Sequence, residues 1–302
     1  MAEQEFSRLA QMVLAELATR CDLSVHDAES VHQHSNLAIA LPSAGLLIRI
    51  SGRTNRLAGI TASVQVTRWL AGKGYPCITP ADISPFEVDG HSVSVWHLLE
   101  VAEGPPGTGA ELGRLLRMLH AQPEPPFDVP YLDDPLAGVA AALDQHGHCL
   151  PDSDHTWLER RIHQLRELWN ELVPALPVGL IHGDAHTNNL IRTKQGRVLL
   201  GDWDHVALGP REWDLIQPHY MRRRFSRHTA QDIDEFTAEY GWDVRDWGGY
   251  QDLVELREIS GLSPYIRQAP SRPWSRSEVA HRVATLRQRN TAATWNSPPR
   301  MS

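Results

Sequence analysis

Residues 178–204 contain side chains that could bind a cation and accept a proton. An apolar run leads into a polar loop that holds Asp184, and two short apolar runs follow. Asn189 precedes the first of these runs, and Asp202 follows the second. Amide and carboxylate oxygens are ligands that a hard cation such as Mg²⁺ prefers. A separate carboxylate can orient an attacking hydroxyl and accept its proton, so these residue types suit phosphoryl transfer with Asp184 as the base.

The spacing within this stretch predicts how the two metal-binding candidates meet. The apolar runs are typical of two short strands, and Lys194-Gln195-Gly196-Arg197 between them is typical of a tight turn. If Gln195 and Gly196 are the two central turn residues, counting outward places Asn189 directly opposite Asp202. Opposed side chains of this kind have Cβ atoms about 5 Å apart. We therefore expect Asn189 and Asp202 to bind one cation together.

Hydrophobic periodicity predicts the elements that position these residues. The first hundred residues favour a small sheet with helices, and the remainder favours a mainly helical arrangement, so the chain is expected to have an α+β fold. The expected elements of the first part are a helix at 3–20, strands at 37–41, 46–50 and 93–99, and a helix at 58–72.

Three motifs together resemble the aminoglycoside phosphotransferase family. They are His182-Gly183-Asp184-Ala185-His186-Thr187-Asn188-Asn189, Gly201-Asp202-Trp203-Asp204 and Gly209-Pro210-Arg211-Glu212-Trp213-Asp214-Leu215. The resemblance implies a protein-kinase-like fold of two lobes, with an antiparallel-sheet N-lobe at 1–99 and a helical C-lobe at 100–302. It implies ATP or GTP in the cleft, Asp184 as catalytic base, and Mg²⁺ bound by Asn189 and Asp202. It also implies that Asp214 holds the catalytic loop through hydrogen bonds.

The N-lobe resembles the same family in three places. Strand 46–50 carries Arg49 where relatives place the basic residue that reaches the nucleotide phosphates. The preceding turn, with Ser35 and Asn36, resembles the loop over the phosphates. The family usually has an acidic residue at the position of Ser63, so the usual partner of the basic residue is missing. Residues 96–100 resemble the hinge that meets the base through backbone groups, here those of His97, Leu98 and Leu99.

Composition and charge disfavour several classes of partner and location. The 302 residues carry a formal charge of −8, which disfavours nucleic-acid binding. Three widely spaced cysteines, no signal-like N-terminus and no long apolar run predict a cytoplasmic protein without a membrane partner. The oligomeric state is left open. Residues 205–302 have a net charge of +2, because 14 arginines outnumber 12 acidic residues. Their main basic run, 221–228, suits either a solvated helix end or a contact for an anionic or polar ligand.

Several alternatives remain open on the sequence alone. A metallophosphoesterase and a glycosyltransferase each lack further motifs that those enzymes need. A non-catalytic kinase-like binding module is favoured by Ser63 and disfavoured by the intact acidic and amide residues. The acceptor is expected to be a neutral or weakly charged hydroxylated small molecule, either an antibiotic or related natural product, or a metabolic sugar or amino alcohol. The roles of His186 and Asp204 are open. Candidate stacking rings for the acceptor are Trp242, Trp247, Tyr250 and Tyr265.

Overall fold

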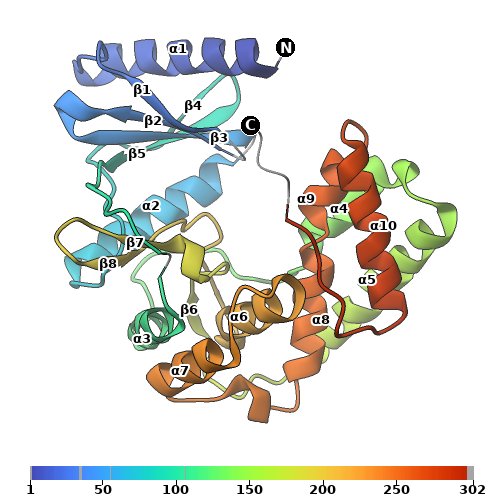
Figure 1. The fold of residues 1–302 in the computed structure, drawn as a ribbon. Helices are drawn as coiled ribbons and strands as arrows, with labels where there is room; N and C mark the ends of the chain where they lie inside the picture. The colour runs from blue at the N-terminus through green and yellow to red at the C-terminus, as the bar shows by residue number, and fades with distance from the viewer. Residues whose placement is uncertain (1, 34–35, 55, 106, 298–302) are drawn as a thin grey trace.

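The computed structural model describes residues 2–33, 36–54, 56–105 and 107–297. A five-stranded antiparallel sheet with the order β1-β2-β3-β5-β4 forms the first part. Helix α1 covers one face of this sheet, and α2 lies on the other side (Figure 1). The bounds are α1 Ala2–Cys21, β1 Glu29–Gln33, β2 Asn36–Leu41, β3 Leu46–Thr54, α2 Leu57–Gly72, β4 Phe86–Val88 and β5 His91–His97.

The alternation of strand β3 explains the direction of Arg49. Ile48 and Ile50 are buried in the same cluster as Val13 and Leu17 of α1. Successive side chains of a strand point to opposite faces of the sheet. Arg49 therefore points away from α1, toward the larger part of the molecule, as its contacts below show.

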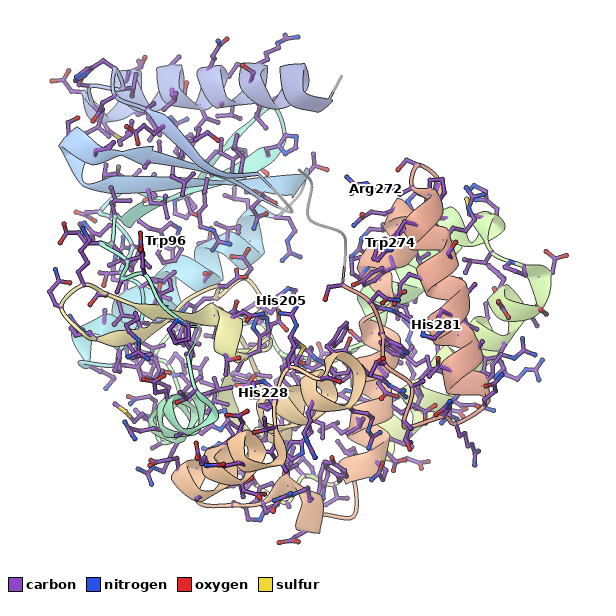
Figure 2. The ribbon with its side chains drawn as sticks, viewed as in Figure 1. Trp96, His205, His228, Arg272, Trp274 and His281 are labelled. Carbon is purple, nitrogen blue, oxygen red and sulfur yellow. The ribbon has the colours of Figure 1, made fainter. Side chains whose placement is uncertain are left out.

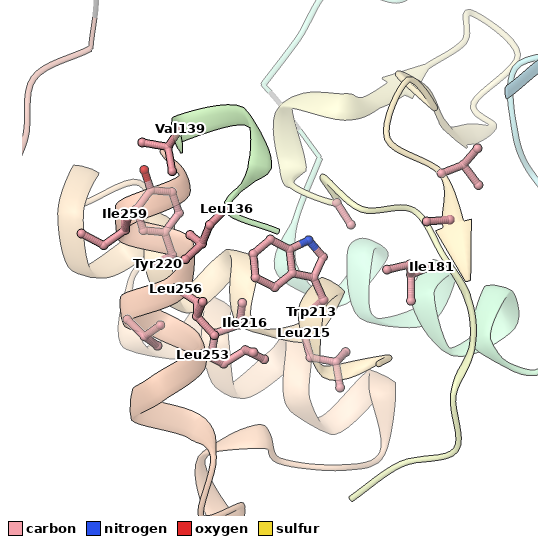
Figure 3. Close-up of a cluster of buried hydrophobic side chains, with 14 of the residues drawn as sticks. Leu136, Val139, Ile181, Trp213, Leu215, Ile216, Tyr220, Leu253, Leu256 and Ile259 are labelled. Atoms are coloured by element: carbon pink, nitrogen blue, oxygen red, sulfur yellow. The ribbon is translucent and has the colours of Figure 1, made fainter. Parts of the chain in front are cut away.

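The second part is mainly helical and packs around one large hydrophobic core. Figure 3 shows a portion of this core, in which the Trp213 ring lies among aliphatic side chains of α4, α6 and α8. Its helices are α3 Gly109–His120, α4 Ala137–His146, α5 Asp152–Glu171, α6 Glu212–Phe225, α7 Ala230–Tyr240, α8 Tyr250–Ser260, α9 Ser263–Gln268 and α10 Pro273–Arg287. Two small antiparallel ribbons complete it, β6 Gly179–Ile181 with β9 Ala207–Gly209, and β7 Leu190–Arg192 with β8 Val198–Leu200.

The expected α+β, two-lobed arrangement is confirmed. The sheet ends at His97 and the helical part begins with α3 at Gly109. Side chains of α2 belong to the core of the larger part, although α2 precedes the last two strands in sequence. The division into 1–99 and 100–302 stays a prediction. In the part of the chain that the structure describes, no helix has both the length and the apolar character needed to cross a bilayer.

The expected register of the β7–β8 hairpin is wrong by one residue. Leu190 pairs with Leu200, so Asn189 lies opposite Gly201 and not opposite Asp202. The loop has three residues rather than two, because Gly196 adopts a φ of 80° and its N–H donates to Thr193 O at 2.9 Å. A turn followed by a left-handed glycine is the usual form of such a loop. The correction places Asp202 one residue beyond the strand pairing.

Two glycines with similar backbone angles provide a test of local packing. Gly183 has a φ of 84°, and a Cβ atom there would lie 2.1 Å from the carbonyl oxygen of His205. Gly196 has a φ of 80°, and a Cβ atom there would meet no other atom within 4 Å. We expect Gly196→Ala to lower the free energy of unfolding by about 1 kcal/mol, the cost of a left-handed alanine.

Gly183→Ala is expected to lower the free energy of unfolding by more than about 3 kcal/mol, because backbone must move to relieve the overlap. Urea denaturation of both variants measures the difference. Equal losses for the two substitutions would contradict the close approach of residues 183 and 205.

Candidate active site

The loop at residues 182–189 is held from beneath by Asp214 in the first turn of α6. Its fully buried carboxylate accepts hydrogen bonds from the backbone N–H groups of His182 at 2.7 Å and Gly183 at 2.8 Å. His120 Nε2 lies 3.1 Å from the same carboxylate. Burial would raise the pKa of Asp214, but the His120 hydrogen bond and charge outweigh it and lower that pKa. The role that the family resemblance implied for Asp214 is confirmed.

Asp184 lies in this loop and is anchored by two residues from α6 and α8. Its Oδ1 accepts a hydrogen bond from Gln217 Nε2 at 2.9 Å and another from the Arg257 guanidinium. Arg257 also donates to Gly183 O at 3.3 Å and packs over the Trp213 ring, 4.8 Å from its centre. Sequence reasoning missed Arg257, because it lies 73 residues beyond Asp184 with no motif around it. The carboxylate therefore has a fixed orientation.

Arg257 also sets the charge of this carboxylate. Burial would raise the pKa of Asp184, but the Arg257 guanidinium, followed by His186, outweighs it and lowers the pKa to about 2. His186 Nε2 lies 3.8 Å from Asp184 Oδ2. Burial lowers the pKa of His186 below its ordinary value despite the nearby carboxylate. The site thus presents an ionised Asp184 beside a largely buried imidazole.

Asn189 and Asp202 come together through the backbone that adjoins them. Asn189 O accepts the N–H of Gly201 at 2.8 Å, and Asn189 Nδ2 donates to Asp184 O at 2.9 Å. With its amide nitrogen so engaged, Asn189 keeps its Oδ1 as an acceptor. Asp202 has a φ of 59°, and its side chain is 48% exposed. An amide oxygen and an accessible carboxylate from neighbouring backbone fit a hard divalent cation.

The described residues contain no group of three or more His, Cys, Asp or Glu side chains arranged to hold a metal ion. A cation bound by Asn189 and Asp202 would therefore take its remaining ligands from water and from a nucleotide. That is the usual situation of Mg²⁺ in nucleotide sites. The two residues stay a prediction as metal ligands.

Arg49 finds acidic partners in the 202–204 segment. Its Nη2 lies 2.9 Å from Asp202 Oδ1 and 3.2 Å from Asp204 Oδ2. Asn36 Nδ2 donates to the same Asp204 oxygen at 3.2 Å. Burial would lower the pKa of Arg49, but Asp204 and then Asp202 raise it. Arg49 therefore pairs with Asp202 and Asp204, while Ser63 is buried in α2. Asp204 thus acts as an ion-pair partner between the two parts.

The predicted hinge is partly occupied by internal hydrogen bonds. The N–H of His97 donates to Thr79 O at 3.0 Å, and the N–H of Leu98 donates to Gly45 O at 2.8 Å. Among the described residues, the Leu99 N–H has no backbone acceptor. The role of His97, Leu98 and Leu99 as a hinge for the base stays a prediction. Ser35, predicted to cover the phosphates, lies outside the described residues.

A cavity of about 780 Å³ opens directly beside Asp184. Gln217, Arg257 and His205 line it next to the loop, and Figure 2 shows His205 facing the space between the two parts. Tyr265 of α9 lines it too, whereas the other three rings proposed for stacking are not among its lining residues. Asp184 therefore faces a space large enough for a small-molecule ligand.

A small antiparallel sheet joined to a mainly helical part, with an oriented carboxylate beside a ligand-sized cavity, is the arrangement expected of a small-molecule kinase. A model of the phosphotransferase enzyme family matches residues 35–253. The match spans well over half of the chain, so the protein belongs to this family, as the three motifs indicated. A sequence comparison with curated proteins finds no match.

Solved structures show the same fold. The amicoumacin kinase hAmiN in complex with AMP-PNP, Ca²⁺ and Ami has a TM-score of 0.69 at 14% identity, covering 98% of each chain. The GDP and kanamycin complex of APH(2")-IIia has a TM-score of 0.65 at 17% identity, covering 92% of this chain and 99% of that one. A choline/ethanolamine kinase family protein from Mesorhizobium loti has a TM-score of 0.62 at 20% identity, covering 93% and 94%.

The contact between Arg257 and Asp184 leads to a prediction for the pKa of Asp184. We expect Arg257→Gln to raise the pKa of Asp184 from about 2, because the largest influence that opposes burial is removed while the smaller ones of His186, His205 and His182 remain. Arg257→Lys keeps the positive charge and should retain most of the depression. Titration of ¹³C-labelled aspartate carboxyls by NMR measures both values. An unchanged pKa in Arg257→Gln would contradict the electrostatic role of Arg257.

Proposed function

We propose that the protein transfers the γ-phosphoryl group of ATP or GTP to a hydroxyl of a small molecule. The observation that carries the proposal is the position of Asp184, which is anchored by Gln217 and Arg257 and faces the 780 Å³ cavity. Asn189 is hydrogen-bonded to the backbone of Asp184, so the base and the metal-binding candidate form one unit. We place the reaction in the cytoplasm, where nucleoside triphosphates are available.

In the proposed reaction the acceptor hydroxyl oxygen attacks the γ-phosphorus. The bond to the β–γ bridging oxygen breaks, and the nucleoside diphosphate leaves. The hydroxyl proton passes to Asp184. Since the pKa of Asp184 is about 2, its carboxylate is a weak base, and the proton leaves the hydroxyl late in the transfer. Orientation of the hydroxyl is then the main contribution of Asp184, which suits the loose transition state of phosphoryl transfer.

Asn189 and Asp202 would hold Mg²⁺, whose chemistry is to neutralise charge on the phosphate oxygens. Arg49 of β3 contacts the same segment, which supports a role for its guanidinium in binding the phosphates of the donor. The ion pairs that Arg49 forms with Asp202 and Asp204 weaken the argument for a non-catalytic binding module, since that argument rested on Ser63.

For the acceptor we propose an antibiotic or a related natural product. The names of two similar structures, an amicoumacin kinase and a kanamycin complex, support this class. A metabolic sugar or amino-alcohol kinase is the second candidate, supported by the similarity to a choline/ethanolamine kinase family protein.

Asp184→Asn is expected to lower phosphoryl transfer by about 10²–10⁴-fold, because the hydroxyl loses its oriented proton acceptor. Nucleotide binding should remain. The measurement is transfer of label from γ-labelled ATP or GTP to a panel of hydroxylated compounds, with isothermal calorimetry for the nucleotide. Asp246→Asn, an exposed residue of the C-terminal part, serves as the matched control. Near-normal transfer by Asp184→Asn would show that the base assignment is wrong.

Asp202→Ala is expected to abolish the Mg²⁺-dependent part of nucleotide binding, because half of the proposed protein ligand set is removed. Calorimetric titrations with AMP-PNP, with Mg²⁺ and with EDTA, measure this part directly. If Mg²⁺ strengthened nucleotide binding equally in the wild type and in Asp202→Ala, Asp202 would not be a metal ligand.

A further inference from the structure

The cavity beside Asp184 has an unusual balance of charge. Its acidic lining residues among those that the structure describes are Asp134 and Asp184, with no glutamate. Its basic lining residues are five arginines, which are Arg56, Arg227, Arg257, Arg267 and Arg282. A site that binds a polycation needs the opposite balance.

Both acidic residues of the cavity already have arginine partners. Asp134 Oδ2 accepts hydrogen bonds from Arg166 Nη2 at 2.6 Å and Arg166 Nε at 2.9 Å. Asp184 pairs with Arg257. A cationic acceptor would therefore have to displace an arginine from each carboxylate before it could form an ion pair. The described lining offers no carboxylate without such a partner.

Arg227 differs from the arginines that are committed to carboxylates. Arg257 pairs with Asp184, and Arg282 pairs with Glu278 at 2.8 Å. Arg227 donates instead to the neutral hydroxyl of Ser297 at 3.0 Å, and its side chain is exposed. The positive charge of Arg227 is thus available to a ligand in the cavity.

The arginines of the basic run at 221–228 differ in whether they are buried, exposed or in the lining of the cavity. Arg224 is buried and forms an ion pair with Glu258, with an Nε–Oε1 distance of 2.6 Å. Arg222 is exposed and is not among the cavity-lining residues. Only Arg227 of the arginines in this run lines the cavity in the described structure. The ligand contact that the run suggested is therefore assigned to a single residue.

The C-terminal segment that contacts Arg227 also contacts α9. Ser297, its partner, follows Asn296, whose carbonyl oxygen accepts hydrogen bonds from Arg282 at 2.7 Å and from the Tyr265 hydroxyl at 3.5 Å. Arg267 lies two residues beyond Tyr265 on the same helix and lines the same cavity. Arg227 follows α6 and contacts the C-terminal segment through Ser297, whereas Arg267 of α9 donates to Gly138 O at 3.3 Å and Asp184 belongs to the 182–189 loop.

We propose that the acceptor carries an anionic group, a carboxylate or a phosphate, which Arg227 binds while the reacting hydroxyl faces Asp184. A guanidinium donates two parallel hydrogen bonds to either group, which gives orientation as well as affinity. The inference rests on the proposed phosphotransferase function and names the acceptor class of the same site. It separates this chain from kinases of polycationic antibiotics and of quaternary amines.

Binding of inorganic sulfate tests the anion site without any turnover. The full chain is saturated with AMP-PNP and Mg²⁺, so that the donor site is filled, and sulfate affinity is measured by calorimetry. Arg227→Gln should weaken sulfate binding by about tenfold, the loss expected for one charge-assisted contact. Arg222→Gln, from the same basic run, should leave the affinity unchanged. No sulfate binding by the wild type, or equal binding by all variants, would overturn the proposal.

Turnover tests the acceptor class with matched sugars. D-Glucuronate, D-glucose and D-glucosamine share a pyranose ring and carry a carboxylate, no charge and an ammonium group. They are compared with choline and kanamycin as acceptors of label from γ-labelled ATP or GTP. The anionic compound should have the highest kcat/KM, and Arg227→Gln should raise its KM while Arg222→Gln does not.

The sulfate-binding and turnover experiments together distinguish a failure of this inference from a failure of the proposed function. Preferred transfer to glucosamine, choline or kanamycin would uphold phosphotransfer and overturn the anionic acceptor. Absence of transfer to every compound, together with Arg227-dependent sulfate binding, would support the anion site and count against the proposed reaction with this panel.

Discussion

The geometry of the site depends on one buried carboxylate. Asp214 accepts two adjacent backbone N–H groups, those of His182 and Gly183, and a contact from His120 of α3. A buried carboxylate without these donors would be strongly unfavourable, and the donors without it would be unpaired. The loop and the helices beneath it are thus fixed together. Asp184 follows Gly183 directly, so its position is set by this interaction before any ligand arrives.

Three neighbouring carboxylates have different electrostatic surroundings. Asp214 is buried and serves the backbone, Asp184 is held by Arg257, and Asp202 remains accessible beside Arg49. The same residue type thus supplies a structural acceptor, a candidate base and a candidate metal ligand, according to which cation or N–H group lies nearby. Arginine, always charged, sets each of the last two environments.

Local patterns in the sequence were sufficient for most of the framework. The helix expected at 3–20 is α1, and the two short strands expected on either side of the turn at 194–197 are β7 and β8. The register between these strands was wrong, because it depends on the φ of Gly196, which two different turns of similar sequence can satisfy. Helix α4 was not foreseen, since its short alanine-rich run lacks a marked apolar periodicity.

Contacts between distant segments were beyond reach of sequence reasoning. Neither the pairing of Arg257 with Asp184 nor that of Arg49 with Asp204 leaves a local signal, because each joins residues more than seventy positions apart. The missing acid at Ser63 therefore suggested a defect that the fold compensates from the other part of the molecule. Motifs indicated which residues gather at the site, whereas their partners emerged only from the packing.

The bridge from Arg49 to Asp202 has a consequence for ligand affinity. One carboxylate oxygen cannot serve a guanidinium and a divalent ion equally at the same moment, so a metal–nucleotide complex bound by Asp202, as proposed, would compete with a cation that the chain itself supplies. The apparent dissociation constant of that metal–nucleotide complex would then include the free energy needed to break the Arg49–Asp202 ion pair. Loss of the guanidinium would remove the competitor and a phosphate contact together, and the sign of its net effect measures which of the two is larger.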